Sequence, residues 1–108
     1  MVDNYDWLHC IPQGWEKIGR QMIQECEAID SRYVILDMKE KYGMLRTCSI
    51  YSHDDIPKIE SRYEDISSKT CCICGKPATK ISTGWICPYC DNCGDKDEKF
   101  YKRFKKNY

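Results

Sequence analysis

Apolar residues recur at helical spacing in two stretches of this 108-residue chain. In the first stretch, positions 15, 18, 22, 26 and 29 are apolar, and the charged residues between them mostly fall on other faces. Pro12 suits the first turn of this helix because a missing N–H costs nothing there. In the second stretch, positions 56, 59, 63 and 66 form one stripe, and Asp54 or Asp55 can cap the helix that it predicts.

Between the two helices, apolar and polar residues alternate, which is typical of strands. Val34, Leu36 and Met38 share one predicted face, and the alternation resumes over residues 44–50 after a turn at Gly43. A short C-terminal helix is predicted where positions 100, 104 and 108 are aromatic. The order of an N-terminal helix, a β-hairpin, a second helix, a cysteine-rich hairpin and a short C-terminal helix predicts an α+β fold.

The chain contains no internal repeat, low-complexity segment or flexible linker, so we expect a single domain over residues 1–108. Its expected parts are an α-β-β-α part over 1–69, a zinc ribbon over 70–95 and a basic C-terminal helix or tail over 96–108. A domain of this size has a small core, which a bound metal ion often supplements.

Six of the nine cysteines lie in the segment TCCICGKPATKISTGWICPYCDNCG, residues 70–94. Cys71, Cys74, Cys90 and Cys93 form two C-x2-C pairs separated by fifteen residues, a spacing typical of four-thiolate zinc sites. Each pair, placed in a tight turn, directs two sulfurs at one point, and a bend at 83–84 folds the two pairs together. The sequence therefore predicts a structural Zn²⁺ ion bound by these four residues.

A second choice of ligands stays open, with Cys87 and Cys90 as the second pair. The first choice is favoured because Cys74 and Cys93 each precede a glycine, which can adopt the positive φ of a metal-binding turn. Four thiolates fill the coordination sphere of zinc, and a filled sphere is typical of structural rather than catalytic sites.

The sequence assigns roles to four of the cysteines outside this set and leaves Cys10 without one. Cys26 and Cys48 are predicted on core faces, where they act as small apolar residues. Cys72 and Cys87 adjoin ligands, so a redox or metal-exchange switch is a minor alternative.

Basic and acidic residues balance at 17 each, which argues against a whole-surface attraction to nucleic acid or anionic lipid. Residues 96–108 nevertheless carry six basic and two acidic residues. No apolar run approaches the roughly 20 residues that span a bilayer, and the first residues lack a signal-peptide pattern. An odd number of cysteines fits poorly with a full set of disulfides, and reduced thiols are typical of the cytoplasm. Together these patterns predict a cytoplasmic protein without membrane contact.

Four segments occur in an order that resembles a group of small phage and prophage proteins of uncharacterised function: GWEKI (14–18), KEKYGMLR (39–46), YEDIS (63–67) and the cysteine-rich segment (71–93). In that group a KEKFGGLR-like motif precedes C-x2-C-G-x-P and a Trp-containing hairpin that ends in C-x2-C. The resemblance implies zinc on the same four cysteines and an accessory protein of a bacterial virus, acting in the host cytoplasm. The chain departs from the group at Met44, where a second glycine is usual, and at Cys72 and Cys87.

Three classes of function compete. The favoured one is a non-catalytic module that binds a host protein, as an inhibitor or adaptor, including a role against host defence. Three Trp and eight Tyr supply good interface anchors, although Trp15 and Trp85 are expected in the core. The pattern does not indicate an oligomeric state.

The alternative is a nucleic-acid-binding zinc ribbon that uses the basic tail, where cations are interleaved with aromatic residues. Contacts with nucleic acid or with a partner would then involve eight basic residues: Lys39, Lys41, Arg46, Lys99, Lys102, Arg103, Lys105 and Lys106. The simpler explanation of the tail is a solvated helix whose late lysines favour its dipole.

An enzyme is the least supported class. The sequence contains no phosphate loop, nucleophile elbow or paired-histidine motif. His9 and His53 are its only imidazoles, and both are expected to be surface or capping residues. We therefore expect a protein that is not an enzyme.

Overall fold

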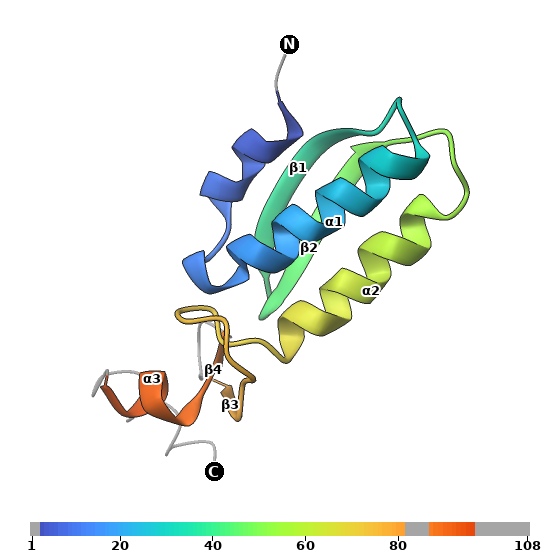
Figure 1. The fold of residues 1–108 in the computed structure, drawn as a ribbon. Coiled ribbons are helices and arrows are strands. Elements are labelled where there is room, and N and C mark those ends of the chain that lie inside the picture. The colour runs from blue at the N-terminus through green and yellow to red at the C-terminus, as the bar shows by residue number, and fades with distance from the viewer. Residues whose placement is uncertain (1–2, 82–86, 97–108) are drawn as a thin grey trace.

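The computed structural model describes residues 3–81 and 87–96, and its fold is α+β (Figure 1). Two short 3-10 helices precede the first α-helix, and a β-hairpin, a second helix and a small cysteine-rich unit follow. In chain order the elements are η1 (Asn4–Cys10), η2 (Gln13–Trp15), α1 (Glu16–Ile29), β1 (Val34–Lys41), β2 (Met44–Ile50), α2 (Ile56–Ser68), β3 (Lys80–Ile81), β4 (Pro88–Tyr89) and α3 (Asp91–Lys96). The predicted bend at 83–84, Trp85 and residues 97–108 lie outside the described residues.

The hairpin closes through a two-residue turn. Lys41 pairs with Met44, and the residues between them, Tyr42 and Gly43, have φ of 55° and 80°. Positive φ at both central residues is the geometry that matches the right-handed twist of the strands. Gly43 adopts it without steric cost, as predicted, and Met44 simply begins β2.

A β-bulge in β1 changes which side chains face the core. The pairing register shifts between Ile35 and Asp37. Ile35 and Met38, three residues apart, are therefore both buried, whereas Val34 and Leu36 are 43% and 51% exposed. The predicted core face is thus wrong for Val34 and Leu36, because strict alternation does not anticipate an inserted residue.

The two cysteines predicted on core faces have different outcomes. Cys26, on α1, is fully buried, as its helical spacing predicts. Cys48 is exposed on β2, so that prediction is wrong. The strand pairs Cys48 with Asp37 on the side of the hairpin that the helices do not cover.

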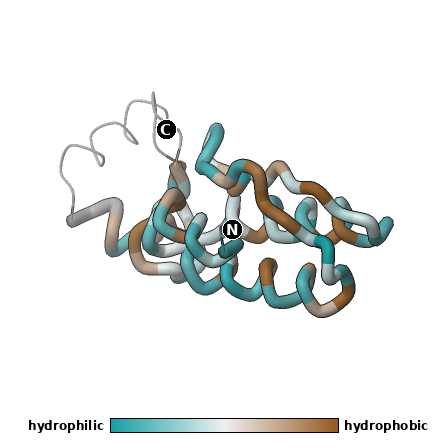
Figure 2. The backbone as a smooth tube through the Cα atoms, turned by 90° about the horizontal axis from the view of Figure 1, so that it is seen from above, coloured by the Kyte–Doolittle hydropathy of each residue, from teal (hydrophilic) through white to brown (hydrophobic). Residues whose placement is uncertain are grey.

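The core lies between the hairpin and the two longer helices. In Figure 1, α1 passes in front of the hairpin and α2 runs beside it. Coloured by hydropathy, the helical coils carry short apolar and polar stretches in alternation, as expected of elements with one face on a core (Figure 2). The largest fully buried side chains are Trp15, Met22, Ile23, Met38, Leu45 and Ile56. Each contributes about 1.5–3 kcal/mol through burial of apolar surface.

Side chains complete the backbone hydrogen bonding at both edges of the hairpin. The buried Asn4 amide accepts from the Ile35 N–H at 2.8 Å and donates to the Tyr33 carbonyl at 2.9 Å, which fixes η1 against β1. On the other edge, the Ser67 hydroxyl accepts from the Leu45 N–H at 2.7 Å and connects β2 to α2. These contacts occupy strand N–H groups that would otherwise be open to a neighbouring chain.

Asp30, buried at the end of α1, fixes the loop that leads into α2. Its carboxylate accepts from the N–H groups of Arg32, Ser52 and His53 and from the Ser52 hydroxyl, at 2.6–2.9 Å. These hydrogen bonds, that of the Ser52 N–H most of all, hold the Asp30 pKa well below its usual range. At the start of α2, Asp55 occupies the capping position without a side-chain cap, and its N–H donates to His53 Nδ1 at 3.1 Å.

Candidate metal centre

The structure brings together the four cysteines named as ligands. The sulfurs of Cys71, Cys74, Cys90 and Cys93 all lie within 4.8 Å of one another, and those of Cys74 and Cys90 are 3.5 Å apart. Zinc–sulfur bonds of about 2.3 Å in a tetrahedron require sulfurs about 3.8 Å apart. The cluster therefore fits a tetrahedral metal ion if the sulfurs adjust their separations by about 1 Å or less.

The first pair occupies a tight turn closed by backbone hydrogen bonds. The Gly75 N–H donates to the Cys71 carbonyl at 3.0 Å, and the Cys71 N–H donates to the Lys76 carbonyl at 2.7 Å. Gly75 has φ +83°, the left-handed conformation predicted for the residue after the second cysteine. A Cβ at Gly75 would also lie 3.0 Å from the Gly14 carbonyl, so this position requires glycine for two reasons.

The second pair is held differently. Cys90 directly follows β4, whereas Cys93 lies in α3, and the Cys93 N–H points at the Cys90 sulfur at 3.3 Å. Gly94 lies within α3 as well. The sequence argument from glycine therefore holds for the first turn and not for the second, where the start of a helix aims the amide at the sulfur.

Hydrogen bonds from the backbone make the cluster suited to a cation. Burial raises the pKa of the Cys71 thiol, but the N–H groups of Cys74, Cys90 and Ile73 outweigh it and lower the pKa to about 7. Burial and the neighbouring thiols raise the pKa of Cys93. Four sulfurs this close cannot all carry negative charge alone, and a divalent cation removes that conflict.

Cys72 and Cys87 form a separate pair beside the cluster. Both are buried, each with 7% of its surface exposed. The Cys72 N–H donates to the carbonyl of Pro88, the residue after Cys87, at 2.9 Å, and this bond brings Cys72 next to Cys87. A hydrogen bond with the Cys87 thiol raises the pKa of Cys72, and burial is the second largest cause of the increase. Among the described residues, the sulfurs that the fold gathers within 4.8 Å of one another are those of Cys71, Cys74, Cys90 and Cys93, so the alternative set with Cys87 is not the one assembled. Burial of both thiols limits their contact with oxidants in solution, which does not favour the redox switch.

The metal centre is attached to the core at the start of α1. The Gly14 N–H donates to the Cys72 carbonyl at 2.8 Å, and the Trp15 indole N–H donates to the Thr70 carbonyl at 2.9 Å. A Cβ at Gly14 would lie 2.2 Å from the Cys71 carbonyl oxygen, so only glycine permits this approach. Sequence reasoning missed this contact, although Gly14 and Trp15 both belong to the GWEKI segment.

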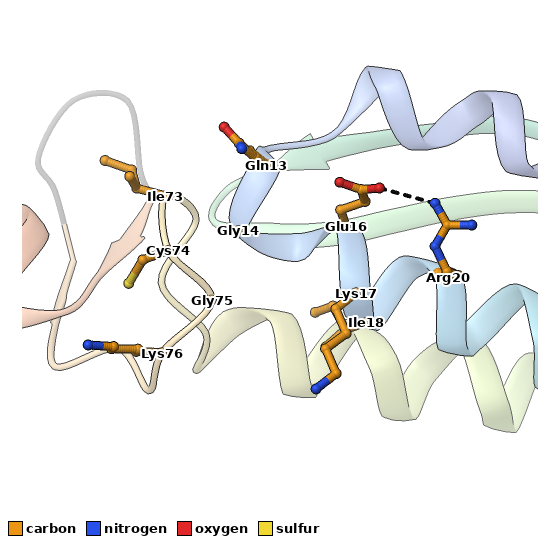
Figure 3. A pocket seen from close by; sticks show the side chains of 10 residues that line it. All are labelled: Gln13, Gly14, Glu16, Lys17, Ile18, Arg20, Ile73, Cys74, Gly75 and Lys76. Atoms are coloured by element: carbon orange, nitrogen blue, oxygen red, sulfur yellow. Dashed lines mark hydrogen bonds and ion pairs between the residues drawn. The ribbon is translucent and has the colours of Figure 1, made fainter.

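A cleft of about 700 Å³ separates the first metal-binding turn from α1 (Figure 3). Lys76 lies on the side of the turn and Lys17 on the side of α1, while Arg20 pairs with Glu16 at 3.1 Å. The Cys74 sulfur is directed away from α1 (Figure 3), and it belongs to the cysteine cluster. Of the side chains that line this cleft, Glu16 is the one carboxylate, and none is a histidine.

The predicted contact residues divide into two groups. Lys39, Lys41 and Arg46 line one hollow of about 300 Å³ on the hairpin, together with Asp37. The five basic residues of the tail lie outside the described residues: Lys99, Lys102, Arg103, Lys105 and Lys106. Neither histidine joins the cysteine cluster, because His9 is on η1 and His53 is at the start of α2.

Within the part of the chain that the structure describes, no helix combines the length and apolar character needed to cross a membrane. Comparison with protein-family models, with curated proteins and with solved structures found no match to this chain. The resemblance to small phage proteins therefore stays a hypothesis drawn from the motifs alone.

Proposed function

We propose that this chain is a zinc-stabilised, non-catalytic binding module that acts by contacting another protein, as an inhibitor or an adaptor. The observation that carries the proposal is the closed set of four sulfurs from Cys71, Cys74, Cys90 and Cys93. Four thiolates leave zinc no position for water or substrate, so the ion serves the fold. Under the same proposal the protein is a phage accessory product that acts on a host protein in the bacterial cytoplasm.

The proposed zinc ion supplements the hydrophobic core of a small domain. It connects the turn after α2 with β4 and α3, segments that are also joined by the two-residue pairing of β3 with β4 and by single hydrogen bonds such as that from the Cys72 N–H to the Pro88 carbonyl. Structural zinc contributes about 10–16 kcal/mol of binding energy in small domains, and this energy becomes folding energy. The ion would therefore hold the ribbon rigid against the Gly14 and Trp15 contacts.

The cleft beside α1 and the hollow on the hairpin support binding rather than catalysis. The cleft beside α1 offers a single carboxylate, already paired with Arg20, so it lacks the second acid or the base that general acid–base chemistry requires. The hollow on the hairpin is cationic and also carries one carboxylate, Asp37. Both surfaces suit recognition of charged and apolar groups.

Nucleic-acid binding is the second candidate, favoured by the convergence of Lys39, Lys41 and Arg46 on one hollow. Three cations on a small surface can contact phosphates. Binding of this kind weakens steeply as salt increases, by roughly 0.7–0.9 decades per decade of salt for each phosphate contact. Titration of labelled single-stranded and duplex oligonucleotides at two salt concentrations tests it.

The protein-binding proposal is tested by affinity capture from bacterial lysate with the zinc-loaded chain as bait. A Cys71→Ser variant, which loses a ligand and therefore the ribbon, is the matched control. The proposal predicts a stoichiometric partner that the zinc-loaded chain retains and the variant does not. Capture of nucleic acid without protein, or of no partner from several bacterial lysates, contradicts it.

A further inference from the structure

The outward face of the hairpin carries an apolar strip next to a group of cations. Val34 pairs with Ile50, Asp37 pairs with Cys48, and Leu36 is the unpaired bulge residue between these two pairs. Val34, Leu36 and Ile50 are 43%, 51% and 55% exposed, and Cys48 is exposed as well. We call Val34, Leu36, Cys48 and Ile50 the outer strip.

The bulge is the cause of this arrangement. It lets Ile35 and Met38 both enter the core, so the residues between and around them face away from it. Single exposed apolar residues are ordinary, but a contiguous group of them beside a charged group can form the apolar part of an interaction surface. Bulges commonly re-aim side chains at functional positions.

The cationic hollow continues the same face toward the hairpin turn. Lys39 pairs with Arg46 across the strands, and Lys41 follows two residues later. The hollow is lined by three cations against one acid, Asp37, which lies 3.2 Å from Lys39. Arg46 also lies 3.5 Å from Glu64 on α2, and a partly exposed pair of this kind is weak enough for Arg46 to exchange Glu64 for a carboxylate of a partner.

We propose that the outer strip and the cationic hollow together bind an acidic, apolar segment of a partner protein, in which aliphatic or aromatic side chains lie next to carboxylates. This inference rests on the proposed protein-binding function and assigns that function to one face. Apolar side chains of the partner would cover Leu36 and Ile50, while its carboxylates would pair with Lys41 and Arg46. Complementary charge then fixes the direction in which the segment lies.

Three other occupants fit less well. The four residues of the outer strip include no aromatic ring, and the exposed Tyr42 and Tyr51 lie outside it, so the strip itself gives nucleic-acid bases no stacking platform. A second copy of the chain needs about 800 Å² per partner for a stable dimer, whereas three half-exposed aliphatic side chains offer a few hundred at most. The basic segment 96–108 of the chain itself would place its positive charge on cations.

The test uses zinc-loaded full chain as the target for a yeast-displayed library of random twelve-residue peptides. We expect the selected peptides to combine Asp or Glu with Leu, Ile or Phe. Their affinity should fall at least tenfold for Leu36→Asp and at least threefold for Lys41→Glu. Ile81→Asp, on β3, and Lys58→Glu, on α2, change an exposed aliphatic residue and an exposed lysine elsewhere and should leave affinity unchanged.

All four variants change exposed side chains, so each should keep its zinc content and circular dichroism, which are measured first. A titration of the ¹⁵N-labelled chain with a selected peptide should shift amide signals of residues 34–50. Selected peptides without acidic residues, or peptides that bind Leu36→Asp and Lys41→Glu as well as the parent chain, overturn this inference. The second result leaves protein binding on another face, whereas enrichment of no peptide opposes the proposed function too.

Binding of a dT12 oligonucleotide or of anionic phosphatidylserine vesicles distinguishes the remaining sources of negative charge. If either one binds more tightly than the peptides and is lost in Lys41→Glu but kept in Leu36→Asp, the face recognises phosphate and the inference is wrong. Failure of both probes to compete with the selected peptides supports it.

Discussion

Replacement of Gly14 by alanine should loosen the metal centre without altering any metal ligand. A Cβ at this position would lie 2.2 Å from the Cys71 carbonyl oxygen and 2.5 Å from the Cys72 carbonyl carbon. Both atoms belong to the backbone, so no side-chain rotation relieves the overlap. The metal-binding turn must then move away from η2 by about 1.2 Å to restore an ordinary contact of 3.4 Å.

The cost follows from three contributions. Strain of this kind costs about 1–3 kcal/mol, and the Gly14 N–H to Cys72 carbonyl hydrogen bond, now 2.8 Å, is lost at a further cost of about 1 kcal/mol. The smaller conformational freedom of alanine in the unfolded chain returns about 0.4–1 kcal/mol. The net loss is about 2 kcal/mol, which lowers the Tm of a domain of this size by roughly 8 °C.

Gly19→Ala is the matched control on α1. Its Cβ would meet Leu8 Cδ2 at 2.9 Å and Ile11 Cδ1 at 3.0 Å, which are the flexible ends of side chains. The gain of about 1 kcal/mol in helix propensity offsets that crowding, so the net change stays within about 1 kcal/mol. Urea unfolding followed by circular dichroism, together with zinc release to a chromogenic chelator, measures both variants. Equal stability and equal zinc release in Gly14→Ala and the parent chain would refute the reasoning.

Three further predictions concern the ligands, a half-buried carboxylate and the indole contact. Cys93→Ser should abolish stoichiometric zinc binding, while Cys87→Ser should keep it; the opposite result in metal analysis by mass spectrometry would support the alternative ligand set. Burial raises the Glu60 pKa of the folded protein above that of the unfolded chain. The folded protein therefore loses stability as pH rises through the raised pKa, and it loses none below about pH 4.3, where the folded and unfolded states are both protonated. Glu60→Gln should therefore be more stable than the parent chain at pH 7 and equal to it near pH 4; lower stability at pH 7 in urea titrations would contradict this. Trp15→Phe leaves the Thr70 carbonyl without its indole donor and should cost about 1–2 kcal/mol in the same titrations, and no change would show that water replaces the donor.

Local sequence patterns predicted the helices and the cysteine cluster well. Helical spacing identified Met22 and Cys26 as core residues because a packed helix repeats its buried face every three to four residues. It overestimated the stripes at the helix ends, where Ile29 and Ile66 are 42% and 37% exposed. The cysteine spacing succeeded because each pair of ligands is close in sequence, so turn geometry alone brings it together.

Features that depend on distant contacts could not be predicted in this way. The bulge that exposes Leu36 is an inserted residue whose position depends on how β1 packs against the helices. The requirement for glycine at Gly14 comes from a carbonyl 57 residues later in the chain, at Cys71. Asn4, which completes the edge of β1, lies in a 3-10 helix that no apolar periodicity marks.

X-ray absorption at the zinc edge, on protein purified under reducing conditions, tests the central claim most directly. The account predicts one zinc ion per chain, surrounded by four sulfur atoms at about 2.3 Å and by no lighter ligand. A nitrogen or oxygen ligand in the first shell, or protein that folds fully without bound metal, would contradict a closed structural site at Cys71, Cys74, Cys90 and Cys93.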